Sequence, residues 1–260
     1  MSNALKIALI QSELIWEYPE KNRINFSKKI LSIKEDIDLI ILPEMFTTGF
    51  TMNPYEIAET MQGESIRWLK KLAAEKNTAI TGSLIIKENN NFYNRLVFVF
   101  PSGEIQTYDK RHTFTLAGEH KVYTAGNKKL IVDYKGWKIC PLICYDLRFP
   151  VWSRNFEGYD VLIYVANWPK PRISAWDTLL KARAIENMSY CIGVNRIGKD
   201  ENNYEYTGSS AAFDSLGKQI STAKPNEQRT EIITLKKESL VKTRDTFQFL
   251  KDQDQFTLIH

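Results

Sequence analysis

The stretch LICYDLRFP, residues 142–150, ends a run of apolar residues and places Cys144 at the start of a polar turn. A buried strand that ends in such a turn presents its next side chain at the carboxyl edge of a sheet, where α/β proteins keep their binding and catalytic groups. A thiol there can act as a nucleophile if one group removes its proton and another stabilises the resulting oxyanion.

Two further strand ends carry chemical groups. Residues 39–44, LIILPE, end in Glu44, and residues 105–111, IQTYDKR, contain Lys110. Taken alone, each would be an ordinary surface group, and Cys144 alone would be a buried core thiol. Together, the carboxylate, the ammonium and the thiol resemble the Glu-Lys-Cys site of the nitrilase superfamily of carbon-nitrogen hydrolases. The resemblance extends from about Ala4 to about Leu240, with the three motifs in family order.

The apolar pattern alternates strands and helices along the chain. It predicts strands at 5–11, 38–42, 79–86, 96–100, 105–110, 130–132, 137–143, 161–166, 190–196, 210–214 and 231–235, and helices near 26–33, 66–73, after Pro150 and at 176–188. Such a pattern favours an α/β protein with a mixed sheet covered by helices. The resemblance implies a four-layer α-β-β-α sandwich: a domain at 1–240, residues 241–260 as its C-terminal tail, and a homodimer.

Composition narrows the class of protein. The 260 residues are 43% hydrophobic and 25% charged, which is typical of a soluble globular protein. The net charge of +4 is spread along the chain, which argues against a nucleic-acid or membrane partner. The sequence shows neither a signal-peptide pattern nor an apolar run of about 18 residues. Three cysteines argue against a disulfide framework and predict a cytoplasmic protein, with Cys140 and Cys191 buried.

The resemblance implies a role for each matched residue. Glu44 would be the general base that takes the proton of Cys144 and returns it to the departing amine. Lys110 and the backbone N–H of Tyr145 would stabilise the tetrahedral oxyanion. Within AGEH, residues 117–120, Glu119 resembles a second glutamate that holds the lysine or aligns the substrate amide. A thioester would form and be hydrolysed, and this chemistry requires neither a metal nor an organic cofactor.

The motif CYDLRFP, residues 144–150, resembles the ω-amidase branch of the superfamily, which hydrolyses small 2-oxo acid amides such as 2-oxoglutaramate and 2-oxosuccinamate. Nitrile-hydrolysing relatives usually have Trp-Glu where this chain has Tyr145 and Asp146. A small-molecule amide that carries a carboxylate needs a cation in its pocket, and Arg148 and Arg172 are the candidates.

Three aromatic residues, Trp168, Phe46 and Trp176, are expected to wall the pocket. Three alternatives stay open from the sequence. The chain could be another amidase of the superfamily, acting on N-carbamoyl amino acids or aliphatic amides. It could be a Cys-His hydrolase that uses His112 or His120, or a non-catalytic dimeric scaffold.

Overall fold

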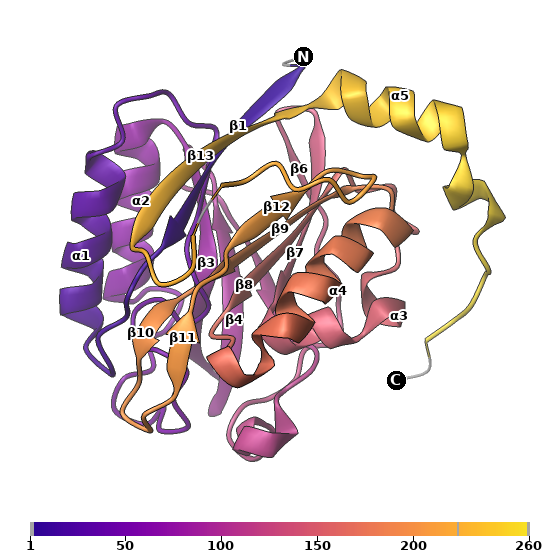
Figure 1. Cartoon of the computed structure of the whole chain (residues 1–260). Coiled ribbons are helices and arrows are strands. Elements are labelled where there is room, and N and C mark those ends of the chain that lie inside the picture. The colour runs from indigo at the N-terminus through magenta and orange to yellow at the C-terminus, as the bar shows by residue number, and fades with distance from the viewer. Residues whose placement is uncertain (1–2, 223, 259–260) are drawn as a thin grey trace.

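Two β-sheets packed face to face form the centre of the molecule (Figure 1). The computed structural model describes residues 3–222 and 224–258. Within them, the first sheet has the order β13-β1-β2-β3-β4-β5 and the second has the order β12-β9-β8-β7-β6. The strands of the first sheet are β1 (Ala4–Gln11), β2 (Leu39–Ile41), β3 (Ala79–Glu88), β4 (Asn91–Val99), β5 (Ile105–Asp109) and β13 (Arg229–Lys236). Those of the second are β6 (Val132–Tyr134), β7 (Trp137–Ile143), β8 (Val161–Ala166), β9 (Tyr190–Asn195) and β12 (Ala211–Phe213).

Helices cover the outer face of each sheet. Helices α1 (Pro19–Leu31) and α2 (Glu64–Lys76) lie on the first sheet, while α3 (Pro150–Ser153) and α4 (Ile173–Glu186) lie on the second (Figure 1). Helix α4 approaches β9 closely at Gly193, where an added Cβ would lie 2.5 Å from both Trp176 and Leu180. This arrangement confirms the predicted four-layer α-β-β-α sandwich.

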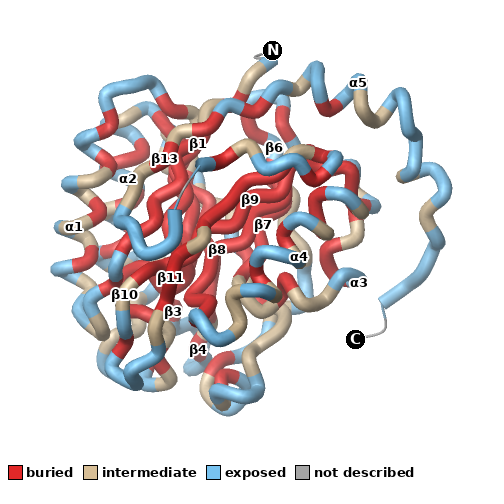
Figure 2. Tube along the Cα trace, viewed as in Figure 1, coloured by how far each residue is buried: buried red, intermediate tan, exposed pale blue. Residues whose placement is uncertain are grey.

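The two apolar layers of the core follow from the alternation of side chains along each strand. In β1, Leu5, Ile7 and Leu9 belong to the apolar cluster between the two sheets, whereas Ala8 and Ile10 belong to the cluster under α1 and α2. Successive side chains of a strand point to opposite faces, so a strand with apolar residues at every position is buried on both sides. Figure 2 shows this as buried strands enclosed by helices whose outer faces are exposed.

Several strand ends meet at one edge of the sandwich. Strand β2 is parallel to β1 and β3, and β7, β8 and β9 are parallel to one another. Strand β5 has the direction of β3, because both are antiparallel to β4. The residues that follow β2, β5, β7 and β8 are therefore brought to the same edge, as the sequence predicts.

Some elements differ from the expectation. Strand β4 begins at Asn91 and so extends the predicted strand 96–100 through a half-polar segment. The hairpin of β10 (Ile197–Lys199) and β11 (Glu205–Thr207) was not predicted, because its strands have three residues each and little apolar alternation. Residues 111–127, where the apolar pattern predicts neither a strand nor a helix, contain the short 3₁₀ turns η1 (Thr115–Ala117) and η2 (Glu119–Lys121).

The C-terminal segment lies along the outside of the molecule. Helix α5 (Lys237–Phe247) leaves the end of β13, and η5 (Phe249–Asp252) follows it (Figure 1). The expected boundary between domain and tail at residue 240 falls inside α5 and stays a prediction. Cys140 and Cys191 are buried and free, as predicted. In the described part of the chain, none of the helices has the length and apolar character to span a membrane.

Candidate active site

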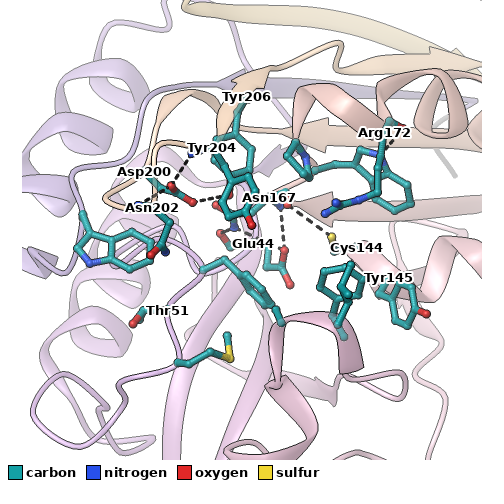
Figure 3. A pocket seen from close by; sticks show the side chains of 18 of the residues that line it. Glu44, Thr51, Cys144, Tyr145, Asn167, Arg172, Asp200, Asn202, Tyr204 and Tyr206 are labelled. Carbon is teal, nitrogen blue, oxygen red and sulfur yellow. Dashed lines mark hydrogen bonds between the residues drawn. The ribbon is translucent and has the colours of Figure 1, made fainter.

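A cavity of about 870 Å³ opens at the edge where the strand ends meet. Its lining includes most of the predicted site residues, and Figure 3 shows Glu44 and Cys144 at its centre. The predicted residues that line it are Glu44, Lys110, Cys144, Tyr145, Arg148, Trp168 and Arg172. The fold therefore brings together, around a single cavity, side chains that lie far apart in the sequence.

Glu44 is fully buried behind the cavity, and hydrogen bonds fix both of its carboxylate oxygens. Oε1 accepts from Asn94 Nδ2 at 2.8 Å and from Lys110 Nζ at 2.9 Å. Oε2 accepts from the backbone N–H of Asn167 at 2.8 Å. The side chain of Asn167 also donates to the backbone carbonyl of Glu44 at 2.7 Å. These contacts join the ends of β2 and β8, so they fix where the carboxylate lies.

Lys110 forms a buried cluster with two carboxylates. Its Nζ lies 2.9 Å from Glu44 Oε1 and 2.9 and 3.1 Å from the two oxygens of Glu119. Burial disfavours the cation, but the negative charges of Glu119 and Glu44 outweigh that cost and raise the pKa of Lys110 above its usual value. Burial raises the pKa of Glu119, and the charge of Lys110 opposes that rise. Lys110 is therefore held as a cation.

Cys144 begins the 3₁₀ turn η3 (Cys144–Arg148) directly after β7, with a left-handed backbone at φ 41°. Its Sγ lies 3.9 Å from the backbone oxygen of Asn167. Burial raises the pKa of the thiol well above its usual value, and the charge of Glu44 adds to the rise, while the charge of Lys110 opposes it. The resting thiol therefore keeps its proton, beside a carboxylate that can accept it.

The backbone N–H of Tyr145 lies in the first turn of η3. Amides in the first turn of a helix have no acceptor within that helix. This amide is thus suited to meet a negative oxygen beside Cys144, as expected for the second oxyanion donor.

Two guanidinium groups line the same cavity. The Cζ of Arg148 lies 4.9 Å from the centre of the Trp168 ring, and that of Arg172 lies 5.1 Å from the centre of the Phe114 ring. The indole N–H of Trp168 donates to the backbone oxygen of Arg172 at 2.7 Å. Neither arginine forms an ion pair with an acidic side chain that the structure describes. Both cations are therefore available to an anionic ligand in the cavity.

The prediction that Phe46 and Trp176 wall the pocket is wrong, because neither belongs to the cavity lining. Trp176 is fully buried in α4, behind Trp168. The ring of Phe46 is fully buried under α1 and α2, with its centre 5.6 Å from that of Phe26 and 5.9 Å from that of Trp68. Met45 has a left-handed backbone at φ 42°, which turns the chain between Glu44 and Phe46. The two residues consequently face different layers, although they are close in the sequence.

The two candidate histidines, His112 and His120, do not line the cavity. Nδ1 of His112 lies 2.8 Å from Asp146 Oδ1, and its ring stacks on Phe149 with centres 3.7 Å apart. His120 is exposed. Neither lines the cavity, so this geometry gives no support to a Cys-His pair. Across residues 3–222 and 224–258, no three or more His, Cys, Asp or Glu side chains are arranged to hold a metal ion.

Several residues at the site were not foreseen. Asn94 donates to Glu44 and, at 3.2 Å, to Glu119, while Asn167 holds Glu44 from the end of β8. Two residues of the unpredicted hairpin also line the cavity: Asp200, directly after β10, and Tyr206, in β11 (Figure 3). Asn167 had a signal, since it follows an apolar strand at the same edge. Asn94 had none, because its role depends on pairing within the sheet.

Comparisons with known proteins agree with this arrangement. A model of the family described as Carbon-nitrogen hydrolase matches residues 6–245. Omega-amidase YafV of Yersinia enterocolitica is 43% identical over 99% of this chain and 100% of that protein. The 2-oxoglutaramate amidase of Bacillus subtilis strain 168 is 34% identical over 82% of this chain and 83% of that protein.

A solved structure shows the same fold. XC1258 from Xanthomonas campestris, a CN-hydrolase superfamily protein with an arsenic adduct in its active site, has a TM-score of 0.96 and 39% identity. The match covers 99% of this chain and 100% of that one. With the family model and these relatives spanning most of its length, the chain belongs to the carbon-nitrogen hydrolase family.

Proposed function

We propose that this protein is an ω-amidase, which releases ammonia from a small carboxylate-bearing amide such as 2-oxoglutaramate or 2-oxosuccinamate. The observation that carries the proposal is one cavity that holds both the Glu44–Lys110–Cys144 group and two arginines without a described acidic partner. Relatives named omega-amidase and 2-oxoglutaramate amidase support the substrate class.

The reaction begins at the thiol of Cys144. Glu44 takes the thiol proton while sulfur attacks the amide carbon, so nucleophile and negative charge form together. The tetrahedral oxygen receives hydrogen bonds from Lys110 Nζ and from the backbone N–H of Tyr145. Glu44 then returns the proton to the amide nitrogen, ammonia leaves, and a thioester remains on the sulfur.

Water completes the cycle. Glu44 removes a proton from a water molecule, and the hydroxide attacks the thioester carbon at the same oxyanion site. Collapse of this second intermediate releases the carboxylic acid and restores the thiol of Cys144. Glu44 carries the proton in each of these transfers, and the sequence of steps calls for neither a metal nor an organic cofactor.

Glu119 acts through Lys110. With both carboxylate oxygens on the ammonium and the Phe114 backbone N–H donating to Oε2, it holds the lysine at the cavity wall. Since Lys110 also contacts Glu44, the lysine keeps the general base and the oxyanion donor adjacent.

At the other end of the substrate, the carboxylate pairs with Arg148 and Arg172, while Trp168 provides an apolar wall between the two ends. An N-carbamoyl amino acid also carries a carboxylate, so it is the main competing substrate. We further propose a cytoplasmic homodimer with no nucleic-acid or membrane partner, which sedimentation of the purified protein can test for its oligomeric state.

The test is an ammonia-release assay with 2-oxoglutaramate, 2-oxosuccinamate, an N-carbamoyl amino acid, an aliphatic amide and a nitrile. We expect one of the two oxo-acid amides to give the highest kcat/KM, and rapid-quench mass spectrometry to show an acyl adduct on Cys144. The Cys144→Ala variant should fold but neither turn over nor form the adduct. A higher kcat/KM on the N-carbamoyl acid would replace the ω-amidase assignment, and full activity of Cys144→Ala would refute the thioester.

A further inference from the structure

We propose that Asp146 is the positioning residue of this site, and that its carboxylate fixes the nucleophile turn relative to the segment that carries Lys110. This inference rests on the proposed function for its kinetic consequences, but not for its geometry. Asp146 lies two residues after Cys144. Its carboxylate is bound by Tyr108, His112 and Ile143, and not by the reacting groups themselves. It acts through the backbone of both segments.

The carboxylate of Asp146 is fully buried and receives four donors. Oδ2 accepts from the Tyr108 hydroxyl at 2.8 Å and from the backbone N–H of Ile143 at 3.0 Å. Oδ1 accepts from the backbone N–H of His112 at 3.0 Å and lies 2.8 Å from His112 Nδ1. Each oxygen therefore binds one backbone amide and one side chain.

These donors flank the reacting groups along the chain. Tyr108 precedes Lys110 by two residues and His112 follows it by two, so the carboxylate anchors the chain on both sides of the lysine. Ile143 immediately precedes Cys144. One side chain thus ties the end of β5 in the first sheet to the end of β7 in the second.

The contacts of Asp146 also bear on the left-handed backbone of Cys144. A non-glycine residue at φ 41° is strained, and such a backbone persists only where the surroundings enforce it. Ile143 precedes Cys144 and Asp146 follows it, so the hydrogen bond from the Ile143 N–H to the Asp146 carboxylate closes the turn around Cys144. The carboxylate thereby stabilises the conformation that presents the thiol to Glu44.

An amide side chain cannot replace this carboxylate. A carboxylate has two accepting oxygens, whereas asparagine has one oxygen and one NH₂ donor. Whichever way the new amide turned in an Asp146→Asn variant, its NH₂ group would face a backbone N–H, that of Ile143 or that of His112. One of the two segments would lose its anchor.

The hydroxyl of Tyr108 links the carboxylate to further buried groups. It donates to Asp146 and accepts from Trp152 Nε1 at 3.0 Å and from the backbone N–H of Arg111 at 3.1 Å. Burial, followed by the charge of Asp146, raises the pKa of Tyr108 well above its usual value, so the hydroxyl remains a donor. Tyr108→Phe therefore weakens the grip without removing the carboxylate.

The experiment compares Asp146→Asn with Asp160→Asn. Asp160 is a matched control: it is buried, accepts the backbone N–H of Lys138 at 2.9 Å, and pairs with Arg244 and Lys237 away from the cavity. For both variants we measure the unfolding midpoint, kcat and KM on the best amide, and the rate at which iodoacetamide alkylates Cys144. Cys140 and Cys191 are the internal controls for unfolding, because both are buried in the folded protein.

We expect Asp146→Asn to lower kcat by about 100-fold, the cost of misplacing reacting groups by about 1 Å, with KM nearly unchanged. Alkylation of Cys144 should slow in the folded variant, while Asp160→Asn should lower the unfolding midpoint but change neither kcat nor alkylation. If Asp146→Asn does not fold, Tyr108→Phe is expected to lower kcat about tenfold, which corresponds to one hydrogen bond of about 1.4 kcal/mol.

The proposal would be overturned if Asp146→Asn had the same kcat and the same alkylation rate as Asp160→Asn. If Tyr108→Phe has to be used instead, an unchanged kcat in that variant would overturn it. Alkylation is measured without substrate. If the wild-type protein hydrolyses none of the amides, the proposed function fails, while the alkylation comparison still decides the role of Asp146.

Discussion

Replacement of Arg172 by alanine removes one of the two cations that the cavity offers to a substrate carboxylate. The guanidinium lies over Phe114, lacks an acidic partner within the described residues, and is partly exposed to water. We predict that Arg172→Ala lowers kcat/KM for 2-oxoglutaramate and leaves an uncharged amide of the same length nearly unchanged. The reason is that Arg172 meets the remote carboxylate and not the carbon under attack.

The size of the effect follows from the environment of Arg172. A hydrogen bond to a charged group contributes about 1.5–3 kcal/mol, and partial exposure to water favours the lower end. Arg148 remains in the variant and retains part of the attraction. A loss of about 1.4 kcal/mol corresponds to about a tenfold fall in kcat/KM.

The assay is the initial rate of ammonia release for both amides in the wild type and in two variants. Lys170→Ala is the matched control, because Lys170 lies in the same 3₁₀ turn η4 (Lys170–Arg172), carries the same charge and does not line the cavity. It should change neither rate. Equal losses for the charged and the uncharged amide in Arg172→Ala would refute a contact with the carboxylate. Equal kcat/KM for both amides in the wild type would refute the anionic substrate itself.

The remaining predictions concern the reacting groups. Glu44→Gln should lower kcat by about 100- to 10,000-fold, because the amide keeps the shape but cannot take a proton, whereas His112→Gln and His120→Gln should cost far less; the reverse order would restore the Cys-His alternative. Lys110→Ala should lower kcat by about 100- to 1000-fold and affect KM less, and a near-normal kcat would leave backbone donors as the whole oxyanion site. In Glu44→Gln, burial still holds the pKa of Cys144 above the usual value of about 8.5, so its alkylation by iodoacetamide should accelerate with rising pH through and beyond about pH 8.5. The wild type should show a flatter profile, because Glu44 accepts the thiol proton, and a plateau below about pH 8 in the variant would contradict the raised pKa.

The sequence predicts those parts of the site that a strand end fixes. Glu44 and Cys144 each follow an apolar run, Lys110 follows the strand β5, and the rule that strand ends share an edge brings the three together. Phe46 shows where this reasoning fails, because one left-handed residue, Met45, moves the next side chain to another layer. Backbone turns of this kind have no strong signal in a single sequence when the residue is not glycine.

Residues that act through pairing were the hardest to predict. Asn94 lies in the polar half of β4 and reaches Glu44 only because the sheet places β4 beside β3. Asp146 appeared in the sequence as part of a family motif, but its partners come from β5 and from the loop after it. Both side chains are polar, buried and bound to segments remote in the chain, and such long-range contacts have no local pattern.

We expect the charged groups of the cavity to orient the substrate. At the reacting end, the carboxylates of Glu44 and Glu119 both contact the ammonium of Lys110. Arg148 and Arg172 add positive charge to the lining of the cavity. A substrate with one carboxylate and one neutral amide is drawn in with its amide toward Cys144, since the reverse orientation would bring two negative groups together. Hydrolysis converts that amide into a second carboxylate beside Glu44, so the same charge distribution that aligns the substrate also repels the product.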